Sequence, residues 1–563
     1  MEVSIMLAKT VCTDRQYEAL KKRADAAAAK PVDYIENSIY LRDRDEILKT
    51  AREKVNQVLE LQKRGLICTT GKFVPSVHYP PITQYPFHTQ EEVMATYKMP
   101  EDGLLDIYVH VPFCAQHCSF CHYPGECGSN RDLREKQIKY LDHLEMEMDN
   151  YMKFLGVEKI KARSILFGGG TPTHMDPDLL ERMMKFFTDR IDRTTVTQFN
   201  FDVDAYTLVK EAGIERLKIL AKYGVDRLTI GTQSLNPDIL TLMFRVASVA
   251  TIEEALKNCR EQVTVVDYLK INKMREEGVE ITQELLDKTQ RQGFVLNIEF
   301  VFGFMGQTVD NFADVIEKAC ILHQRGLTDE IQMYRLKVDA YGDFQGMIGP
   351  LYDRDPGMFP DFEETMMQKA VAEEVLKRYG LKGNLRRVYS KNPYIYSHYA
   401  YNQCCAQLDQ IGLGLTAFSS LRDRFFINTD SFDEYYEKTE AGLLALNRGY
   451  VRDKEQQIRW SIILPIKNTE VRKDRFRNIN GFEIDQCFKK KWKKLMDAGL
   501  VVDKPVLGYP SYTMTELGKF VADEVAEEFN SNEFLPWAEN QYIHGDLFPY
   551  DDNTTEDALG IIG

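Results

Sequence analysis

Long apolar runs are absent from this sequence. No stretch of about 18 or more apolar residues, the length of a membrane-spanning helix, occurs among its 563 residues. The beginning of the chain lacks the basic flank and the length of a secretory signal, so we expect a cytoplasmic protein. The net charge is −15, which argues against nucleic acid as the main partner because phosphate binding needs a basic face.

A disulfide framework is also absent. The chain has 11 cysteines, an odd number, and most are scattered, which favours a reducing compartment over a secreted scaffold. Free cysteines usually behave as buried apolar residues, so no role is assigned to Cys127, Cys404 or Cys405. Three other cysteines form one group at Cys-x3-Cys-x2-Cys spacing, namely Cys114, Cys118 and Cys121.

This cysteine group favours an iron–sulfur cluster. Thiolates are the usual ligands of such clusters, and three of them leave one iron of a four-iron cluster open to a small molecule. A zinc site is less favoured because no second pair of Cys or His follows at matching spacing. The remaining alternative is three buried thiols that have this spacing by coincidence.

Short apolar strands alternate with amphipathic helices from about residue 104, the pattern of a parallel α/β sheet. In parallel barrels the chemistry gathers at the carboxyl ends of the strands, and the cysteine group follows the first strand. We therefore predict an α/β fold with a partial, six-stranded (β/α) barrel, and a mostly helical section at 251–292. The predicted strands are Leu105–Val111, Ser164–Phe167, Thr197–Val203, Arg227–Gly231, Val295–Phe302 and Glu330–Leu336.

Four regions are predicted, because the chain is too long for one ordinary core. Residues 1–100 form an N-terminal extension of helices and a strap rich in Pro and Tyr at 74–86, and residues 101–350 form the barrel. Residues 351–450 cover the barrel without strand–helix alternation. Residues 451–563 hold a winged-helix-like module and an acidic tail, so the C-terminal part is expected to be α-rich.

The segment Tyr108-Val-His-Val-Pro-Phe-Cys114, with the two cysteines that follow it, resembles the radical S-adenosylmethionine (SAM) enzymes. More narrowly, it resembles the oxygen-independent coproporphyrinogen III oxidase family, and further matches extend over about Leu104–Asn428. The resemblance implies a [4Fe-4S] cluster on Cys114, Cys118 and Cys121 and one or two SAM molecules. It also implies reductive cleavage of SAM to a 5′-deoxyadenosyl radical, with an electron from a low-potential donor such as flavodoxin or ferredoxin.

The same resemblance assigns residues to SAM. Gly168-Gly-Gly-Thr-Pro-Thr173 resembles the family's glycine segment, where glycines allow close backbone approach and consecutive N–H groups can hold a carboxylate. Asp202 aligns with a family glutamate, Glu299 stands where aspartate is usual, and Arg245 matches an arginine whose fork suits a carboxylate. The expected SAM-binding residues are Tyr108, Phe120, Gly169, Gly170, Thr171, Asp202, Gln233, Arg245 and Glu299.

Two departures from the family bear on the reaction. Tyr123 stands where the coproporphyrinogen oxidases carry a fourth cysteine, and Ser397–Cys405 lacks the His-Asn-x-x-Tyr-Trp signature of the heme-chaperone branch. We therefore predict an enzyme that forms carbon–carbon bonds by methyl or methylene transfer, as in a methyltransferase or cyclopropanase branch. Gly412-Leu-Gly414 is the predicted wall of a second SAM site.

Two other functions stay open. One is oxidative decarboxylation of a porphyrinogen propionate, or another tetrapyrrole modification, and the other is a non-enzymatic heme carrier. The substrate is expected to be a small molecule or a tetrapyrrole, and the protein is expected to be a monomer. No side chain is singled out as a catalytic residue.

Overall fold

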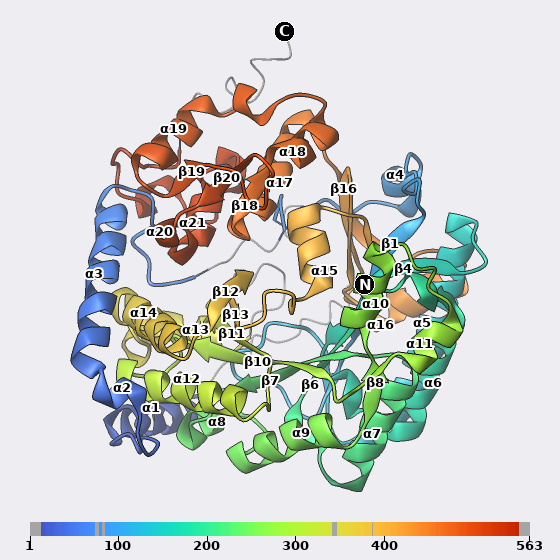
Figure 1. The fold of residues 1–563 in the computed structure, drawn as a ribbon, viewed down its shortest axis with the longest axis horizontal. Helices are drawn as coiled ribbons and strands as arrows, with labels where there is room; N and C mark the ends of the chain where they lie inside the picture. The colour runs from blue at the N-terminus through green and yellow to red at the C-terminus, as the bar shows by residue number, and fades with distance from the viewer. Residues whose placement is uncertain (1–12, 74–77, 82–84, 340–345, 386, 551–563) are drawn as a thin grey trace.

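The computed structural model describes residues 13–73, 78–81, 85–339, 346–385 and 387–550. Within them, one 13-stranded sheet runs through the molecule, and a smaller three-stranded sheet lies in the C-terminal region (Figure 1). No helix in these ranges combines the length and the apolar composition needed to cross a bilayer.

The predicted barrel strands form six neighbouring parallel strands of the large sheet. They are β1 (Leu104–Val111), β4 (Ile160–Gly169), β6 (Gln198–Val203), β7 (Arg227–Gln233), β10 (Val295–Phe302) and β11 (Glu330–Arg335). They lie in the order β1-β4-β6-β7-β10-β11, and side chains such as Ile107 and Phe201 are fully buried because parallel strands are covered on both faces. This confirms the predicted α/β fold.

The six strands do not close into a ring, so the barrel is partial. β1 also pairs with the parallel strand β14 (Gln410–Leu413), and β11 pairs with the antiparallel strand β13 (Val388–Ser390). The main helices around the barrel are α5 (Asn130–Leu155), α6 (Pro177–Asp189), α7 (Lys210–Lys222), α12 (Val309–Gln324) and α14 (Phe362–Arg378). They lie in the connections between the barrel strands or after the last of them.

The predicted helical section at 251–292 is less uniform than expected. It contains the helices α9 (Val249–Glu261), α10 (Tyr268–Glu276) and α11 (Gln283–Lys288), and the antiparallel pair β8 (Thr264–Val266) and β9 (Gln290–Gln292). Strands of three residues are too short for hydrophobic periodicity to reveal them.

Residues 351–450 contain strands that the sequence pattern does not predict. They are β12 (Lys382–Leu385), β13, β14, β15 (Phe418–Leu421), β16 (Arg424–Asn428) and β17 (Leu446–Val451). The glycine segment Gly412-Leu-Gly414 therefore lies at the end of strand β14 and in the turn that follows, where the φ of Gly414 is 97°. Among these strands, β14 pairs with β1 and β13 pairs with β11, which are distant in sequence, and the others pair with strands next to them in the chain.

The N-terminal extension packs along the molecule. It contains α1 (Asp14–Ala29), α2 (Ile39–Arg42) and α3 (Arg44–Lys63), and α3 lies beside α14 (Figure 1), where Lys54 and Glu373 form an ion pair of 2.8 Å. The predicted strap lies partly outside the described residues. Of its described part, His78 is buried with its ring 4.3 Å from Phe418 and 4.5 Å from Phe425.

The C-terminal region has the element order of a winged helix. Its elements are α17 (Lys454–Lys467), β18 (Glu470–Arg472), α18 (Lys473–Asn480), α19 (Lys489–Asp497), β19 (Val501–Asp503), β20 (Ser511–Met514) and α21 (Ala522–Glu527). β20 lies between β18 and β19, and Trp492 of α19 stacks on Tyr512 of β20 at 4.1 Å. This arrangement fits the predicted module, whereas the boundaries between the four regions stay a prediction.

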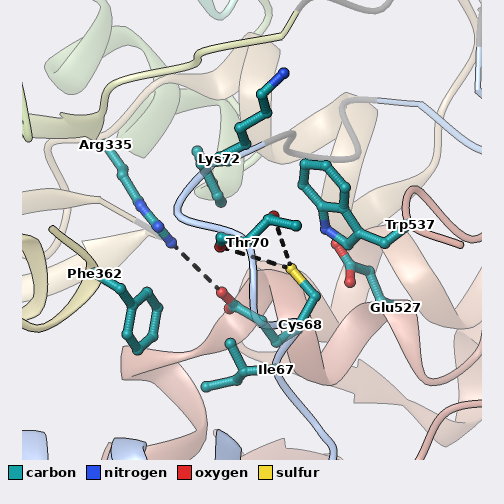
Figure 2. A pocket seen from close by; sticks show the side chains of 10 residues that line it. Ile67, Cys68, Thr70, Lys72, Arg335, Phe362, Glu527 and Trp537 are labelled. Carbon is teal, nitrogen blue, oxygen red and sulfur yellow. Dashed lines mark hydrogen bonds and ion pairs between the residues drawn. The ribbon is translucent and has the colours of Figure 1, made fainter. Parts of the chain in front are cut away.

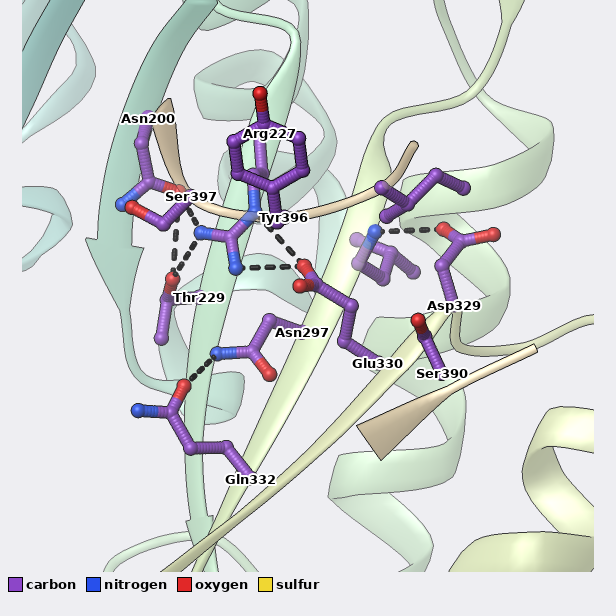
Figure 3. A network of polar contacts seen from close by, with 12 residues as sticks. Asn200, Arg227, Thr229, Asn297, Asp329, Glu330, Gln332, Ser390, Tyr396 and Ser397 are labelled. Atoms are coloured by element: carbon purple, nitrogen blue, oxygen red, sulfur yellow. Dashed lines mark hydrogen bonds and ion pairs between the residues drawn. The ribbon is translucent and has the colours of Figure 1, made fainter. Parts of the chain in front are cut away.

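A buried polar network joins the amino ends of the barrel strands. Figure 3 shows Arg227 of β7 between Glu330 of β11 and Asn200 of β6, at 2.6 Å and 2.7 Å. The side chain of Arg227 is 2% exposed and that of Glu330 is 0% exposed. Because each charge would be costly to bury alone, the pair fixes these strands relative to one another.

Candidate active site

The cysteine group lies in the loop that follows β1, at the carboxyl end of a barrel strand. The loop begins at β2 (Phe113–Cys114) and returns at β3 (Glu126–Cys127), which pairs with β2 in parallel. Cys114, Cys118 and Cys121 are all partly exposed within it. This is the end of a parallel barrel at which chemistry gathers.

The three thiols need a positive charge nearby to ionise. Burial raises the pKa of Cys114 and of Cys121 to about 12. Burial also raises the pKa of Cys118, although the Arg245 guanidinium, 3.2 Å from its sulfur, acts in the opposite direction. Iron supplies such a charge, because a coordinating thiol is deprotonated by the metal.

The donor set fits a cluster better than a single ion. In the described part of the chain, no three His, Cys, Asp or Glu side chains converge closely enough to hold one metal ion. Three cysteines of a four-iron cluster bind three different irons, so they stand farther apart than the ligands of one ion. Among the described residues, the buried Nε of Arg245 has no hydrogen-bond partner, which marks a place where a polar ligand fits.

The glycine segment after β4 positions the cysteine strand. The N–H of Gly170 donates to the carbonyl of Val111 at 2.8 Å, and the N–H of Thr171 donates to the carbonyl of Phe113 at 2.8 Å. These two N–H groups therefore bind the backbone of the cysteine strand. A side chain at Gly170 would begin 2.7 Å from the carbonyl oxygen of Phe113, so this glycine allows the close approach of β2.

Arg245 joins the cysteine loop to the neighbouring strand ends. Its Nη1 donates to Cys118 Sγ at 3.2 Å, and its Nη2 contacts the carboxylate of Asp204 and the carbonyl of Gly231. These contacts use three of the five guanidinium N–H donors, so the Nε–H and one Nη1–H remain for a ligand. Gln233 lies close by, because a side chain at Gly231 would begin 3.1 Å from Gln233 Nε2.

Asp202 and Glu299 lie together inside the barrel. Burial raises the pKa of Asp202 to about 6, and burial together with the Asp202 charge raises that of Glu299 to about 8. The hydroxyl of Tyr334 donates to Glu299 at 3.1 Å, and Asn200 donates to Asp202 at 3.2 Å. Two buried carboxylates with raised pKa values suit a ligand that brings hydroxyl groups or positive charge.

Two other residues that the sequence assigns to SAM lie in different surroundings. Tyr108 is 7% exposed and forms a hydrogen bond of 2.9 Å with Nδ1 of His110. The Asp202 charge contributes to the rise in the pKa of Tyr108 after burial, so Tyr108 belongs to the barrel interior. Phe120 packs instead against an apolar cluster that includes Met243.

Sequence reasoning missed Tyr334 and two arginines. The guanidinium of Arg387 lies 5.4 Å from the ring centre of Tyr334 and 3.2 Å from the carboxylate of Asp523 in α21. Burial lowers the pKa of Arg387 to about 10. Arg335 ends β11 beside Glu524, at 3.9 Å. The signal in the sequence was the position of these basic residues at and after the last barrel strand.

A small cavity lies beside Arg335, between the N-terminal extension and α21. Figure 2 shows Cys68, Lys72 and Phe362 around it, and its volume is about 20 Å³. A cavity needs about 10–15 Å³ of such volume to hold one water molecule. This cavity therefore has room for water and not for a substrate.

Gly412 and Gly414 allow other parts of the chain to pack closely against them. A side chain at Gly412 would begin 2.3 Å from the carbonyl oxygen of Phe418, and one at Gly414 would begin 2.3 Å from the hydroxyl of Tyr140. Both glycines therefore serve packing between β1, α5 and β15. The wall of a second SAM site, predicted for this segment, gains no support from these contacts.

Comparisons with known proteins agree on the family. Residues 108–286 match the family model described as the radical SAM superfamily. The oxygen-independent coproporphyrinogen III oxidase of Escherichia coli (strain K12) is 23% identical over 406 residues, which cover 68% of this chain and 78% of that protein. The heme chaperone HemW of Bacillus subtilis (strain 168) is 23% identical over 425 residues, which cover 75% of this chain and 98% of that protein.

A solved structure shares the fold. The structure titled "Coproporphyrinogen III oxidase (HemN) from Escherichia coli is a Radical SAM enzyme" matches with a TM-score of 0.60 at 19% identity. The match covers 80% of this chain and 96% of that chain. The likeness therefore extends beyond the barrel strands into the flanking regions.

Proposed function

The chain belongs to the radical SAM superfamily, and on this premise we propose that it oxidises a tetrapyrrole that carries carboxylate side chains. The reaction is the oxidative decarboxylation of a propionate. A hydrogen atom passes from the propionate to the SAM-derived adenosyl group, the bond to the carboxyl group breaks, and CO2 leaves. The remaining electron passes to a one-electron acceptor, such as an iron–sulfur or flavin protein, and a vinyl group is left.

The protein's own residues bind, orient and exclude water. Cys114, Cys118 and Cys121 are the proposed cluster ligands, and the cluster and SAM, when bound, supply the carbon radical that takes the hydrogen atom. Arg245 stabilises the thiolate of Cys118 by its charge at 3.2 Å. The buried pair Asp202 and Glu299 is the proposed contact for the hydroxyl and amino groups of SAM.

The observation that carries the choice of substrate is the position of Arg387. Its guanidinium lies over the ring of Tyr334, whose hydroxyl donates to Glu299, so a partly buried arginine lies beside the proposed SAM site. Guanidinium groups bind carboxylates through paired, charge-assisted hydrogen bonds. A substrate propionate can take the place of Asp523, which pairs with Arg387 at 3.2 Å.

Two other reactions are weaker candidates. Methyl or methylene transfer, which the sequence favoured, gains no support from the relatives, which are named as an oxidase and a heme chaperone. Heme binding without turnover is the second candidate, because the match covers 98% of HemW.

For the oxidase, we also propose a cytoplasmic setting and a low-potential flavodoxin or ferredoxin as electron donor.

The experiment is an anaerobic reaction of the iron-loaded protein with SAM, a strong reductant and coproporphyrinogen III, followed by mass spectrometry. We expect 5′-deoxyadenosine together with a product that has lost CO2. S-adenosylhomocysteine with a heavier product would instead establish methyl transfer. Tight heme binding without any 5′-deoxyadenosine would establish the carrier.

A matched pair of variants tests the role of Arg387. Arg387→Gln should raise the KM for the porphyrinogen at least tenfold while SAM cleavage without substrate is retained, because only the substrate contact is lost. Arg325→Gln removes an exposed arginine that pairs with Glu253 and should leave the KM unchanged. An unchanged KM in Arg387→Gln would remove the basis for an anionic substrate.

A further inference from the structure

A fourth cysteine, Cys127, lies on a strand that pairs with the strand of the proposed ligand Cys114. β3 runs parallel to β2, and Cys127 is the register partner of Cys114. The N–H of Glu126 donates to Pro112 at 2.8 Å, and the N–H of Gly128 donates to Cys114 at 3.1 Å. A side chain at Gly125 would begin 2.8 Å from the Pro112 carbonyl oxygen, so a glycine is needed for this return.

The register places Cys127 beside Cys114. Neighbouring strands lie about 5 Å apart, and paired residues of parallel strands face the same side of the pleat. The thiol of Cys127 therefore lies on the same face of the strand pair as the thiol of Cys114.

Cys127 also differs from the remaining cysteines in its exposure. Among the described cysteines it is the one classed as exposed, whereas Cys68, Cys259, Cys320 and Cys487 are buried. An exposed thiol beside the proposed cluster ligand Cys114 is not serving as an apolar core residue. In the same loop, Cys118 is contacted by Arg245, whose buried Nε is a donor without a hydrogen-bond partner among the described residues.

We propose that Cys127 is an exchangeable fourth ligand of the cluster. In the absence of SAM its thiolate binds the iron that Cys114, Cys118 and Cys121 leave open, and SAM displaces it. Binding releases the thiol proton to water and forms one iron–sulfur bond, and no electron is transferred. On displacement that bond breaks, the thiolate regains a proton from water, and the amino and carboxylate groups of SAM take the iron.

The proposal rests on the radical SAM assignment. It predicts that Cys127 slows the loss of iron and also weakens the binding of SAM. A cluster with four cysteine ligands should lose iron more slowly before SAM arrives. SAM must compete with the thiol, so its apparent Kd is raised by the inverse of the fraction of protein in which the iron is open. If Cys127 occupies the iron in about nine molecules of ten, the apparent Kd rises about tenfold.

The first test is alkylation of the iron-loaded protein under anaerobic conditions. Iodoacetamide is added with and without SAM, and modification of Cys127 is followed by peptide mass spectrometry. We expect the rate at Cys127 to increase at least tenfold when SAM is present, because SAM frees the thiol. Equal rates in the two samples would overturn the proposal, and so would a disulfide between Cys114 and Cys127 in both.

The second test compares Cys127→Ala with the control Cys404→Ala, which removes a partly exposed cysteine outside the loop. Cys127→Ala should bind SAM about tenfold more tightly and lose iron to a chelator several-fold faster without SAM. The control should match the wild type in both measurements. A merely structural role for Cys127 would weaken iron retention and SAM binding together, and that result would overturn the proposal.

Iron content and SAM binding show whether a negative result concerns Cys127 or the radical SAM assignment itself. Iron and SAM binding are measured first in the wild type. A wild-type protein that holds no iron–sulfur cluster or binds no SAM would defeat the proposed function itself. A wild type that holds both, with Cys127→Ala unchanged in both, would defeat only the role of Cys127.

Discussion

The pH dependence of SAM binding is the sharpest test of the residues placed at the SAM site. Burial and the neighbouring Asp202 raise the pKa of Glu299 to about 8. Below that pH the side chain is mostly a neutral acid, and above it a carboxylate that can accept hydrogen bonds from ribose hydroxyls and attract the positive sulfonium. SAM affinity should therefore increase as the pH rises through about 8.

The magnitude follows from the ionised fraction. With a pKa of about 8, about one Glu299 in eleven is ionised at pH 7 and about ten in eleven at pH 9. If only the carboxylate form binds well, the apparent Kd for SAM falls about tenfold between these pH values. This corresponds to about 1.4 kcal/mol of binding free energy.

The measurement is anaerobic equilibrium binding of SAM to iron-loaded protein at pH 7 and pH 9. The α-amino group of SAM also loses its proton in this range, so the quantity compared is the ratio of the two Kd values between wild type and Glu299→Gln. The wild-type ratio should exceed the variant ratio about tenfold, because glutamine cannot ionise.

A control variant tests whether the effect is specific to Glu299. Asp226 is another buried barrel carboxylate, with a pKa raised to about 7 by burial, but it lies at the amino end of β7. Asp226→Asn should therefore keep the wild-type ratio. Equal ratios in the wild type and Glu299→Gln would refute the assignment of Glu299 to SAM.

Three further predictions concern the cluster and the barrel. Cys114→Ala should abolish bound iron in an iron assay, and wild-type iron content in that variant would contradict its role as a ligand. Gly170→Val should lose both the cluster and SAM binding, because its side chain would displace the backbone of β2; loss of SAM alone would argue against this packing role. Glu330→Gln should lower the free energy of unfolding by about 3–5 kcal/mol by leaving Arg227 buried without its partner charge. The exposed control Glu284→Gln should cost less than about 1 kcal/mol, and equal thermal shifts for these two variants would contradict the network.

The barrel was predictable because its signals are local. Each of the six parallel strands is a short segment with recurring apolar residues that ends at a polar or glycine-rich segment, and a helix of regular periodicity lies in the connection to the next strand. The strands β12 to β17 carry no comparable signal because they are three to six residues long, and β13 and β14 join the sheet by pairing with the distant strands β11 and β1. Whether Gln410–Leu413 is a turn or a strand depends on Asp106 lying opposite Gln410, which no local pattern encodes.

The sequence by itself determined the chemistry of the candidate site. Three thiols at fixed spacing after a strand form one short loop in any fold that follows, so Cys114, Cys118 and Cys121 could be named in advance. Tertiary structure decided what surrounds them, since the terminal nitrogens of Arg245 contact Cys118, Asp204 and Gly231. Tertiary structure likewise decided that Glu299 contacts Tyr334 and that the strand of Cys127 pairs with the strand of Cys114. Spacing along the chain specifies which groups can reach one another within a loop, whereas burial, pKa and partners across strands depend on how distant segments pack.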